Sequence, residues 1–531
     1  MKKIQQLFVL LVLFSVVLGI RIYWLSQKEG LHVDEGLSVT FACYNEYMYE
    51  SNYEFNRKYT GKEVKEISLC DNGSFRDALE DIYRLWKNNR DDPHTNLYYS
   101  FLRLSLAGLK TGDIRLIILR GGILNLILFS VSFVFFFLLM KLLFPDSKLL
   151  QFSATFCTFL STATISNTLF LRPYQIQETM FIIFCYFFFK TFELKKWVMH
   201  DNKLYINTNL LFSLSIVTAF ALLTGYYTII FIGLFGLYVI SINYKKSNFP
   251  EIKFYIMTLC LGLLFAQAFY SKYFVGYISG RSRQTVSTLF GGFFANIAAS
   301  ISSAVLLLQK HFFTYPVVVV CALCLFYLIF LTFRKQKFLI QKQALYVLAA
   351  SLFYFVIIMF IAPYKLLRYI MPVFPFFIIF PAIMINSIGK WKISAIVMLL
   401  LCAAFFRTSL NHDNIENLYR NKPEEYNFTR DVDTPVFVLN KTFFKYNDMV
   451  PYFNDKQVYY FIDNYKDIAL VRYNELYLVT EAALEKQQPS TGAEGRGSSP
   501  NAIVLEKFKI EQEYTVGYFT CKKMKLIAEG S

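Results

Sequence analysis

Long apolar segments recur along most of this chain, and they constrain its fold more than any other feature. After the first, "KKIQQLFVLLVLFSVVLGIRIYWL", they are 120–143, 149–169, 174–190, 205–223, 226–243, 253–270, 316–333, 344–362, 369–388 and 392–407. Runs of about 17–22 residues are long enough to cross a bilayer core of roughly 30 Å as helices. Hydrophobic residues make up 55% of the 531 residues, which is high for a soluble protein. The sequence therefore predicts an all-α polytopic membrane protein with about 11 transmembrane helices.

The short links between these segments indicate the orientation of the chain. Every second link is rich in Lys and Arg: "KLLFPDSK", "KTFELKKWVMHDNK", "NYKKSNFPEIK", "FRKQKFLIQK" and "GKWK". Basic links are typical of the cytoplasmic side of a membrane. We therefore expect an integral inner or plasma membrane protein with a cytoplasmic N-terminus and an extracytoplasmic C-terminus. Because much of the formal net charge of +16 lies in these links, nucleic acid is not an expected partner.

The lengths of the outer links predict the domain organisation. Residues 1–410 are expected to form the transmembrane domain, with a first outer loop at 27–119 and a third outer loop at 271–315. Residues 411–531 contain strand-like runs such as "TPVFVL" and "NELYLVT", which predict a smaller mixed α/β extracytoplasmic domain. A stretch rich in Gly, Ser and Pro predicts a flexible insert at 487–501.

Distinctive polar residues gather on the predicted outer side. They are His32, Asp34 and Glu35 in "GLHVDEGLSV"; Asp91, Asp92 and His94 in "DDPHTNLYYSFLRL"; Arg172 and Tyr174 in "LRPYQIQ"; and Lys365, Arg368 and Tyr369 in "APYKLLRY". Polar groups of membrane proteins tend to gather at functional sites. A carboxylate is suited to remove the proton of an acceptor hydroxyl, and arginine is suited to bind a departing phosphate. No GxxxxGK[ST] loop for a nucleotide occurs in the chain.

In order along the chain, these motifs resemble the GT-C fold glycosyltransferases. The resemblance is to the branch of the protein O-mannosyltransferases and the lipid A aminoarabinose transferase, and it covers about residues 1–410. It rests on the acidic pair after the first helix, "HTNLYY", "RPY" and the late "RYIMP". The family usually has HPPL where this chain has "HTNL", so the resemblance does not determine the local turn or the choice of acceptor. The tail after residue 410 matches no motif of the family.

The resemblance implies an inverting glycosyltransferase that takes a sugar from a polyprenyl-phosphate donor in the membrane lipid. The acceptor is a hydroxyl of a glycan, lipid or protein at the extracytoplasmic face. Asp34 matches the catalytic base, with Glu35 beside it. The residues expected at the donor phosphate are Arg172, Arg368, Lys365 and Tyr174. The residues expected at the acceptor or cleft are His94, His32 and Tyr369.

Several alternatives remain open from the sequence alone. Asp34 and Glu35 also suit the first turn of a loop helix, where acids are favoured. Arg172 and Arg21 also suit a membrane boundary, where long basic side chains snorkel. Cys43 and Cys70 share the first outer loop, where a disulfide between them is one alternative.

The expected enzyme needs no cofactor. A divalent metal held by His32, His94 and the acids is the alternative, although the spacing of these residues is irregular. The alternative functions are a transporter or lipid flippase and a non-catalytic scaffold. A transporter needs charged residues near the middle of its spans and helices broken at matching places in two halves. Few charges lie within the apolar segments, which favours the transferase.

Overall fold

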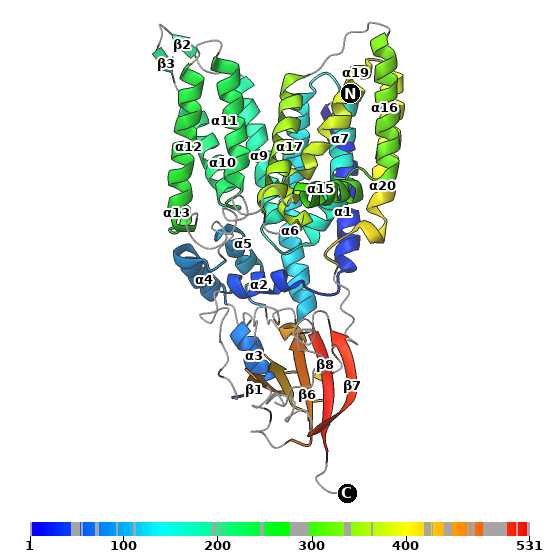
Figure 1. Cartoon of the computed structure of the whole chain (residues 1–531). Helices are drawn as coiled ribbons and strands as arrows, with labels where there is room; N and C mark the ends of the chain where they lie inside the picture. Colours follow the sequence, from blue (N-terminus) through cyan, green and yellow to red (C-terminus); the bar gives the residue numbers. More distant parts are fainter. Residues whose placement is uncertain are drawn as a thin grey trace. The chain divides into compact units, whose positions relative to one another are not determined.

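The computed structural model divides the chain into two compact units (Figure 1). The membrane unit consists of residues 1–27, 82–101 and 121–418, and the sheet unit consists of residues 28–81, 102–120 and 419–531. The structure describes all residues except 1–2, 44–53, 55–56, 69–73, 92–93, 110–112, 194–197, 201–202, 206–207, 245–248, 277–296, 334–340, 363–364, 419–425, 427, 440–445, 447–448, 465–467, 469–472, 482–506, 517–518 and 528–531. Cys70, Asp92 and the predicted insert at 487–501 lie outside the described residues.

Every apolar segment predicted from the sequence is helical. These segments form α1 (Lys3–Ser26), α6 (Ile114–Leu143), α7 (Lys148–Leu160), α8 (Thr162–Leu169), α9 (Tyr174–Glu193), α10 (Thr208–Leu222), α11 (Thr228–Tyr244), α12 (Phe249–Phe269), α16 (Tyr315–Phe333), α17 (Lys342–Ile361), η2 (Met371–Val373), α18 (Phe374–Phe377), α19 (Ile379–Ile388) and α20 (Trp391–Ser409). Among the described residues, seven helices are long and apolar enough to cross a membrane, and one bent pair makes up to eight. The chain is therefore an integral membrane protein.

The shorter elements of the membrane part connect these spans. They are α4 (Phe75–Asn88), α5 (Leu97–Ser105), the hairpin of β2 (Val198–His200) and β3 (Lys203–Tyr205), α13 (Tyr273–Gly276), α15 (Ile297–His311), η1 (Leu367–Tyr369) and η3 (His412–Asn414). Helices α4, α5 and α6 are each divided between the two units, so that one part of the helix belongs to each.

The bent span is the local feature that matters most for the site. Helices α7 and α8 meet at an angle of 55°. The break lies at Ser161, whose extended backbone ends α7 and whose side chain accepts a hydrogen bond from the Thr164 amide to begin α8. Serine is a favoured N-cap because its oxygen satisfies an amide that has no partner in the first helical turn. After α8, a short turn leads into α9, and Arg172 and Pro173 lie in that turn.

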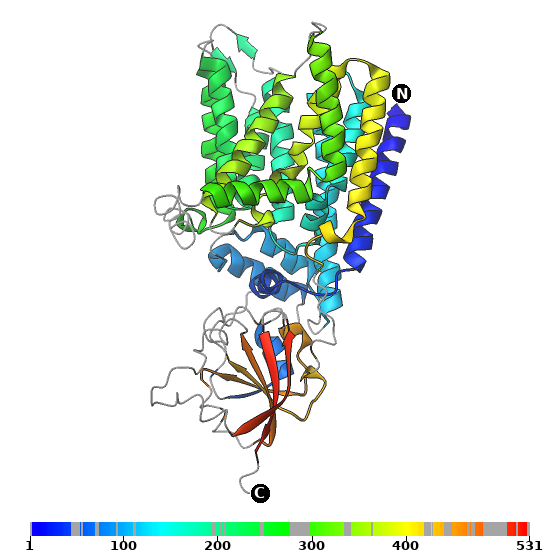
Figure 2. The ribbon, with the colours of Figure 1, turned by 45° about the vertical axis from the view of Figure 1, so that its right-hand side comes forward.

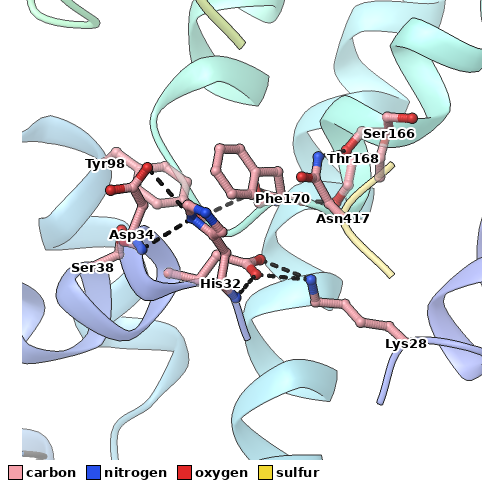
Figure 3. A network of polar contacts seen from close by, with 11 residues as sticks. Lys28, His32, Asp34, Ser38, Tyr98, Ser166, Thr168, Phe170 and Asn417 are labelled. Atoms are coloured by element: carbon pink, nitrogen blue, oxygen red, sulfur yellow. Dashed lines mark hydrogen bonds and ion pairs between the residues drawn. The ribbon is translucent and has the colours of Figure 1, made fainter. Parts of the chain in front are cut away.

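The segment that follows α20 is tied to two other parts of the membrane unit. The Glu416 amide donates to the Ser166 hydroxyl over 2.9 Å. The Asn417 side chain donates to the Ser166 carbonyl over 3.1 Å, and both residues are labelled in Figure 3. The Glu416 carboxylate pairs with Lys310 Nζ at 2.8 Å and His311 Nε2 at 3.2 Å, both at the end of α15. Burial alone raises the pKa of Glu416, but the bonds and charges of His311 and Lys310 outweigh it and lower the pKa to about 2.

The sheet unit is built around one mixed sheet (Figure 2). Its strands are β1 (Lys58–Thr60), β4 (Val436–Leu439), β5 (Val458–Ile462), β6 (Glu475–Glu481), β7 (Phe508–Val516) and β8 (Phe519–Leu526), in the order β1-β5-β4-β6-β8-β7. Strand β4 is parallel to β5 and β6, and the other pairs are antiparallel. The helices α2 (Val33–Ala42), α3 (Gly61–Ser68) and η6 (Val450–Tyr452) complete this unit.

Strand β1 comes from the first outer loop, and it pairs with β5 from the C-terminal region. Thr60 lies opposite Val458 in this antiparallel pair. On β4 and β5, the rings of Phe437 and Tyr460 stack at 4.9 Å within a buried core. The predicted fold class, a polytopic helical membrane protein with a smaller mixed domain near the C-terminus, is confirmed.

Candidate active site

The acidic pair of the sheet unit lies in the first turn of α2. His32 is the N-cap, and its Nδ1 accepts a hydrogen bond from the Asp34 amide over 3.2 Å (Figure 3). The Asp34 carboxylate lies 3.5 Å from the same Nδ1. The Asp34 side chain is 19% exposed, so solvent and a small group can reach it. The position of Asp34 is therefore set by a helix start, and its carboxylate remains accessible.

Glu35 has a different environment although it is the next residue. Its carboxylate accepts from the His32 amide over 2.7 Å, which completes a capping box. It also pairs with Lys28 at 2.9 Å, and both side chains are fully buried. Burial lowers the pKa of Lys28, and the charge of Glu35 opposes that effect. The structure thus uses Glu35 in a helix cap and an ion pair, which is the capping interpretation considered from the sequence.

A second polar group lies in the membrane unit, around the turn between α8 and α9. Arg172 NH1 lies 3.2 Å from Asp91 Oδ2 and donates to the Tyr99 hydroxyl over 3.0 Å. The Tyr99 hydroxyl donates in turn to Asp91. All three side chains are buried. Arg172 does not snorkel to water, because a buried carboxylate and a buried phenol hold it within the protein.

Aromatic rings from three parts of the chain meet beside this ion pair. Tyr174, at the start of α9, lies edge-to-face with His94 at 5.5 Å and with Tyr369 at 6.2 Å. Phe170 stacks on Tyr174 at 6.0 Å. Such ring pairs add about 0.5–1.5 kcal/mol each beyond their burial. The rings therefore join the segments that contain the "HTNLYY", "RPY" and "RYIMP" motifs.

The last two predicted cations lie at the end of α17 and in η1. The Arg368 guanidinium lies 5.4 Å from the centre of the Tyr369 ring, which is a cation–π distance. Lys365 Nζ donates to the carbonyls of Ala362 and Phe360 over 2.8 and 3.2 Å. Lys365 therefore caps the last turn of α17, and its partial burial lowers its pKa.

Two groups of predicted site residues thus emerge. Arg172, Tyr174, His94 and Tyr369 come together in the membrane unit, with Arg368 on the face of Tyr369. His32, Asp34 and Glu35 form the other group, in the sheet unit. Within the described residues, no group of three or more His, Cys, Asp and Glu is arranged to hold a metal ion. Cys43 is disulfide-bonded.

Sequence reasoning missed the partners that hold the membrane group. Asp91 was noted only as one of several outer acids, and Tyr99 was read only as part of a motif. Arg21, which the sequence predicts to snorkel at the membrane boundary, is instead fully buried, and Glu178 is fully buried as well. Their signal in the sequence is an ionisable residue inside an apolar segment, which is rare and usually has a specific purpose.

Among the solved structures that are similar to this chain are two of the protein ArnT. The chain is similar to the crystal structure of ArnT from Cupriavidus metallidurans bound to undecaprenyl phosphate, with 9% identity, 97% of each chain covered and a TM-score of 0.49. It is also similar to the apo state of the same protein, with 10% identity, the same coverage and a TM-score of 0.45. No family model and no curated sequence matches the chain.

Proposed function

We propose that this protein is a membrane glycosyltransferase that moves a sugar from a polyprenyl-phosphate donor to an acceptor hydroxyl at the extracytoplasmic face. The observation that supports it most is the meeting of Arg172, Tyr174, His94 and Tyr369, which come from three separate segments. A guanidinium can bind the oxygens of a phosphate, and aromatic rings offer flat apolar faces on which a sugar ring can pack.

In the proposed reaction Asp34 is the general base. Its carboxylate takes the proton of the acceptor hydroxyl while that oxygen attacks the anomeric carbon of the sugar. The bond between this carbon and the phosphate oxygen breaks, and polyprenyl phosphate leaves with the bonding electrons. Attack from the face opposite the leaving group inverts the anomeric centre. The accessible Asp34 suits this role better than Glu35, whose carboxylate is buried in an ion pair.

The cations have separate proposed tasks. Arg172 and Arg368 neutralise the charge that develops on the departing phosphate, with Tyr174 and Lys365 beside them. Asp91 keeps the Arg172 guanidinium in one orientation through the contact at 3.2 Å. His94, His32 and Tyr369 line the path of the acceptor. An aligned bidentate contact is geometrically more specific than a point charge, so lysine is a poor substitute for either arginine.

The decisive test is sugar transfer by purified protein in proteoliposomes, with polyprenyl-phosphate sugars as donors. Asp34→Asn keeps the size of the side chain and removes the base, so we expect transfer to fall by a factor of about 10²–10⁴. Glu54→Gln is the matched control, because Glu54 is a 75% exposed acid of the same unit. Normal transfer by Asp34→Asn, at normal yield and folding, would remove Asp34 from the mechanism.

A transporter or lipid flippase is the second candidate. The bent pair α7–α8 and the buried charges Arg21 and Glu178 are features that transporters also have. The same proteoliposomes separate the two functions. Wild-type protein that moves a lipid-linked sugar across the bilayer without transferring it to any acceptor would support the transporter, and Asp34→Asn would then leave the movement unchanged.

A further inference from the structure

Side chains from neighbouring helices bind the backbone of the turn between α8 and α9. The Asn125 amide, from α6, donates to the carbonyls of Thr168 and Phe170 over 3.0 and 2.9 Å. The Asn167 amide donates to the carbonyl of Tyr174 over 3.3 Å. The backbone is therefore bonded on both sides of Arg172. The Thr168 and Phe170 carbonyls lie at the end of α8, where carbonyls have no helical partner.

A chain of polar side chains links two buried charges across the same turn. Arg21, from α1, donates to the Thr168 hydroxyl over 3.1 Å, and this hydroxyl donates to Gln175 over 3.0 Å. Gln175 then donates to Glu178 over 3.2 Å. Asn167 also donates to Glu178, over 2.9 Å, so the carboxylate is bonded to both sides of the turn.

Arg21, at the α1 end of this series of hydrogen-bonded side chains, makes further contacts. Arg21 NH1 donates to the Phe159 carbonyl over 2.7 Å, near the end of α7. The guanidinium lies 3.9 Å from the centre of the Phe129 ring. Close packing adds to the polar contacts, because a Cβ atom at Gly121 on α6 would lie 2.8 Å from the Leu171 side chain. The turn is thus held from α1, α6 and α9, and α7 anchors Arg21.

Burying the polar side chains of this network costs free energy unless they hydrogen-bond to one another. Arg21, Asn125, Gln175 and Glu178 are fully buried. Polar groups in this environment must satisfy one another, because lipid offers no hydrogen bonds. Apolar contacts alone are enough to pack helices against one another. Asn125, Gln175 and Glu178 instead bond groups that flank Arg172 and Tyr174. Arg21 reaches the same turn through Thr168 and also bonds Phe159 and Thr164 at the bend between α7 and α8.

We propose that Arg21, Asn125 and Glu178 are positioning residues that hold the turn so that Arg172 and Tyr174 meet the donor phosphate. This inference rests on the proposed function and adds to it a set of residues that touch neither donor nor acceptor. Small displacements of a phosphate-binding group cost binding steeply, because charge-assisted bonds depend on distance and angle.

The test compares two Asn→Leu variants of the full-length protein. Asn125→Leu removes both bonds to the turn and keeps the number and branching of the side-chain heavy atoms. Asn243→Leu is the matched control, because Asn243 is a buried residue of α11 whose amide donates to the Val239 carbonyl of its own helix. We expect Asn125→Leu to raise KM for the lipid-phosphate sugar about tenfold, with little change for the control. A merely structural defect reduces the active fraction, and therefore kcat, without changing KM.

A second measurement does not depend on activity. Hydrogen exchange followed by mass spectrometry reports the opening of residues 169–174, and we expect about tenfold faster exchange there in Asn125→Leu but not in the control Asn243→Leu. Arg21→Lys keeps the charge but loses the planar guanidinium that bonds Thr168. We therefore expect KM to rise and exchange at the turn to become faster, both by less than in Asn125→Leu. This variant decides the question if Asn125→Leu does not fold.

The outcomes separate the two proposals. Unchanged exchange at the turn in both Asn125→Leu and Arg21→Lys would overturn the positioning role. Faster exchange with an unchanged KM in an active enzyme would also overturn it, since the turn would then not matter for the donor. If the wild type transfers no sugar, the proposed function is wrong. Faster exchange in the variants would then show only that these residues hold the turn, with no role at a donor phosphate.

Discussion

Each unit contains a buried ion pair, Lys28–Glu35 in the sheet unit and Arg172–Asp91 in the membrane unit. The two pairs have similar charges and distances but different structural roles. Lys28 and Glu35 are seven residues apart in the sequence and 2.9 Å from each other; Lys28 precedes α2 and Glu35 lies in its first turn. Asp91 and Arg172 are 3.2 Å apart and join two distant segments of the membrane unit. The first pair holds the Glu35 carboxylate at the start of α2. The second pair holds the segment of Asp91 against the segment of Arg172, and both segments contain candidate site motifs. Burial and charge alone therefore do not identify a functional residue.

The largest effect is expected from breaking the long-range pair. Arg172→Met leaves the Asp91 carboxylate buried without its cation, and we expect a loss of about 3–5 kcal/mol in the free energy of unfolding. Thermal unfolding in detergent measures this loss, with the exposed Lys148→Met as the control.

Adding Asp91→Leu sharpens this test. Removing both charges together should restore most of the stability, because an apolar pair of similar volume is often neutral. Transfer should stay low in the double variant, since the proposed phosphate ligand is missing. A double variant with full transfer would show that the pair is only structural.

A smaller effect is expected from the local pair. Glu35→Gln removes the charge that faces Lys28 but keeps an oxygen for the His32 amide, so we expect a loss of about 1–3 kcal/mol. Sugar transfer should remain within about threefold of wild type once the folded fraction is accounted for, because the structure places Glu35 in the cap. A loss of transfer as large as that of Asp34→Asn would instead make the two acids act together.

The smallest effect is expected from a third, more exposed pair. The pKa of Glu416 is lowered from 4.5 to about 2, so its contribution to stability is complete above about pH 4.5 and is lost as the pH falls toward 2. Its side chain is 34% exposed and solvent screens the pairs with Lys310 and His311, which limits the contribution to about 1 kcal/mol.

Unfolding of wild type and Glu416→Gln at pH 6 and pH 3 checks this expectation. The wild type should lose more than half of this contribution between the two pH values, so the variant should lose about 0.5 kcal/mol less than the wild type. Equal losses in both proteins would show that other carboxylates dominate the acid response.

The helices were predictable because each depends on a pattern within about 20 residues. All the apolar segments are helical, and the bend at Ser161 falls inside one of them. Strand β1 was not predictable, because three residues, "KYT", contain no pattern and its partner β5 lies near the other end of the chain. A strand of this length is determined by its neighbour rather than by its own sequence.

The candidate site was predictable in its residues but not in its connections. The motifs around His94, Arg172 and Tyr369 were found in the sequence, and the structure joins them through Tyr174. The pairing of Asp91 with Arg172 and the network around Glu178 depend on contacts between segments far apart in the chain, which a single sequence does not encode in any local pattern. The assignment of Glu35 required the capping box to be seen in three dimensions.

The pairing of β1 with β5 also bears on how the protein is made. The ribosome adds Thr60 early and Val458 only after 398 more residues (458 − 60), which takes roughly 20–80 s at the usual speed of synthesis. During that interval the first-loop strand has left the ribosome and awaits a partner that has not been synthesised. The sheet is therefore completed near the end of translation, after the membrane helices have been inserted, and a chain truncated before β5 leaves β1 without its neighbour.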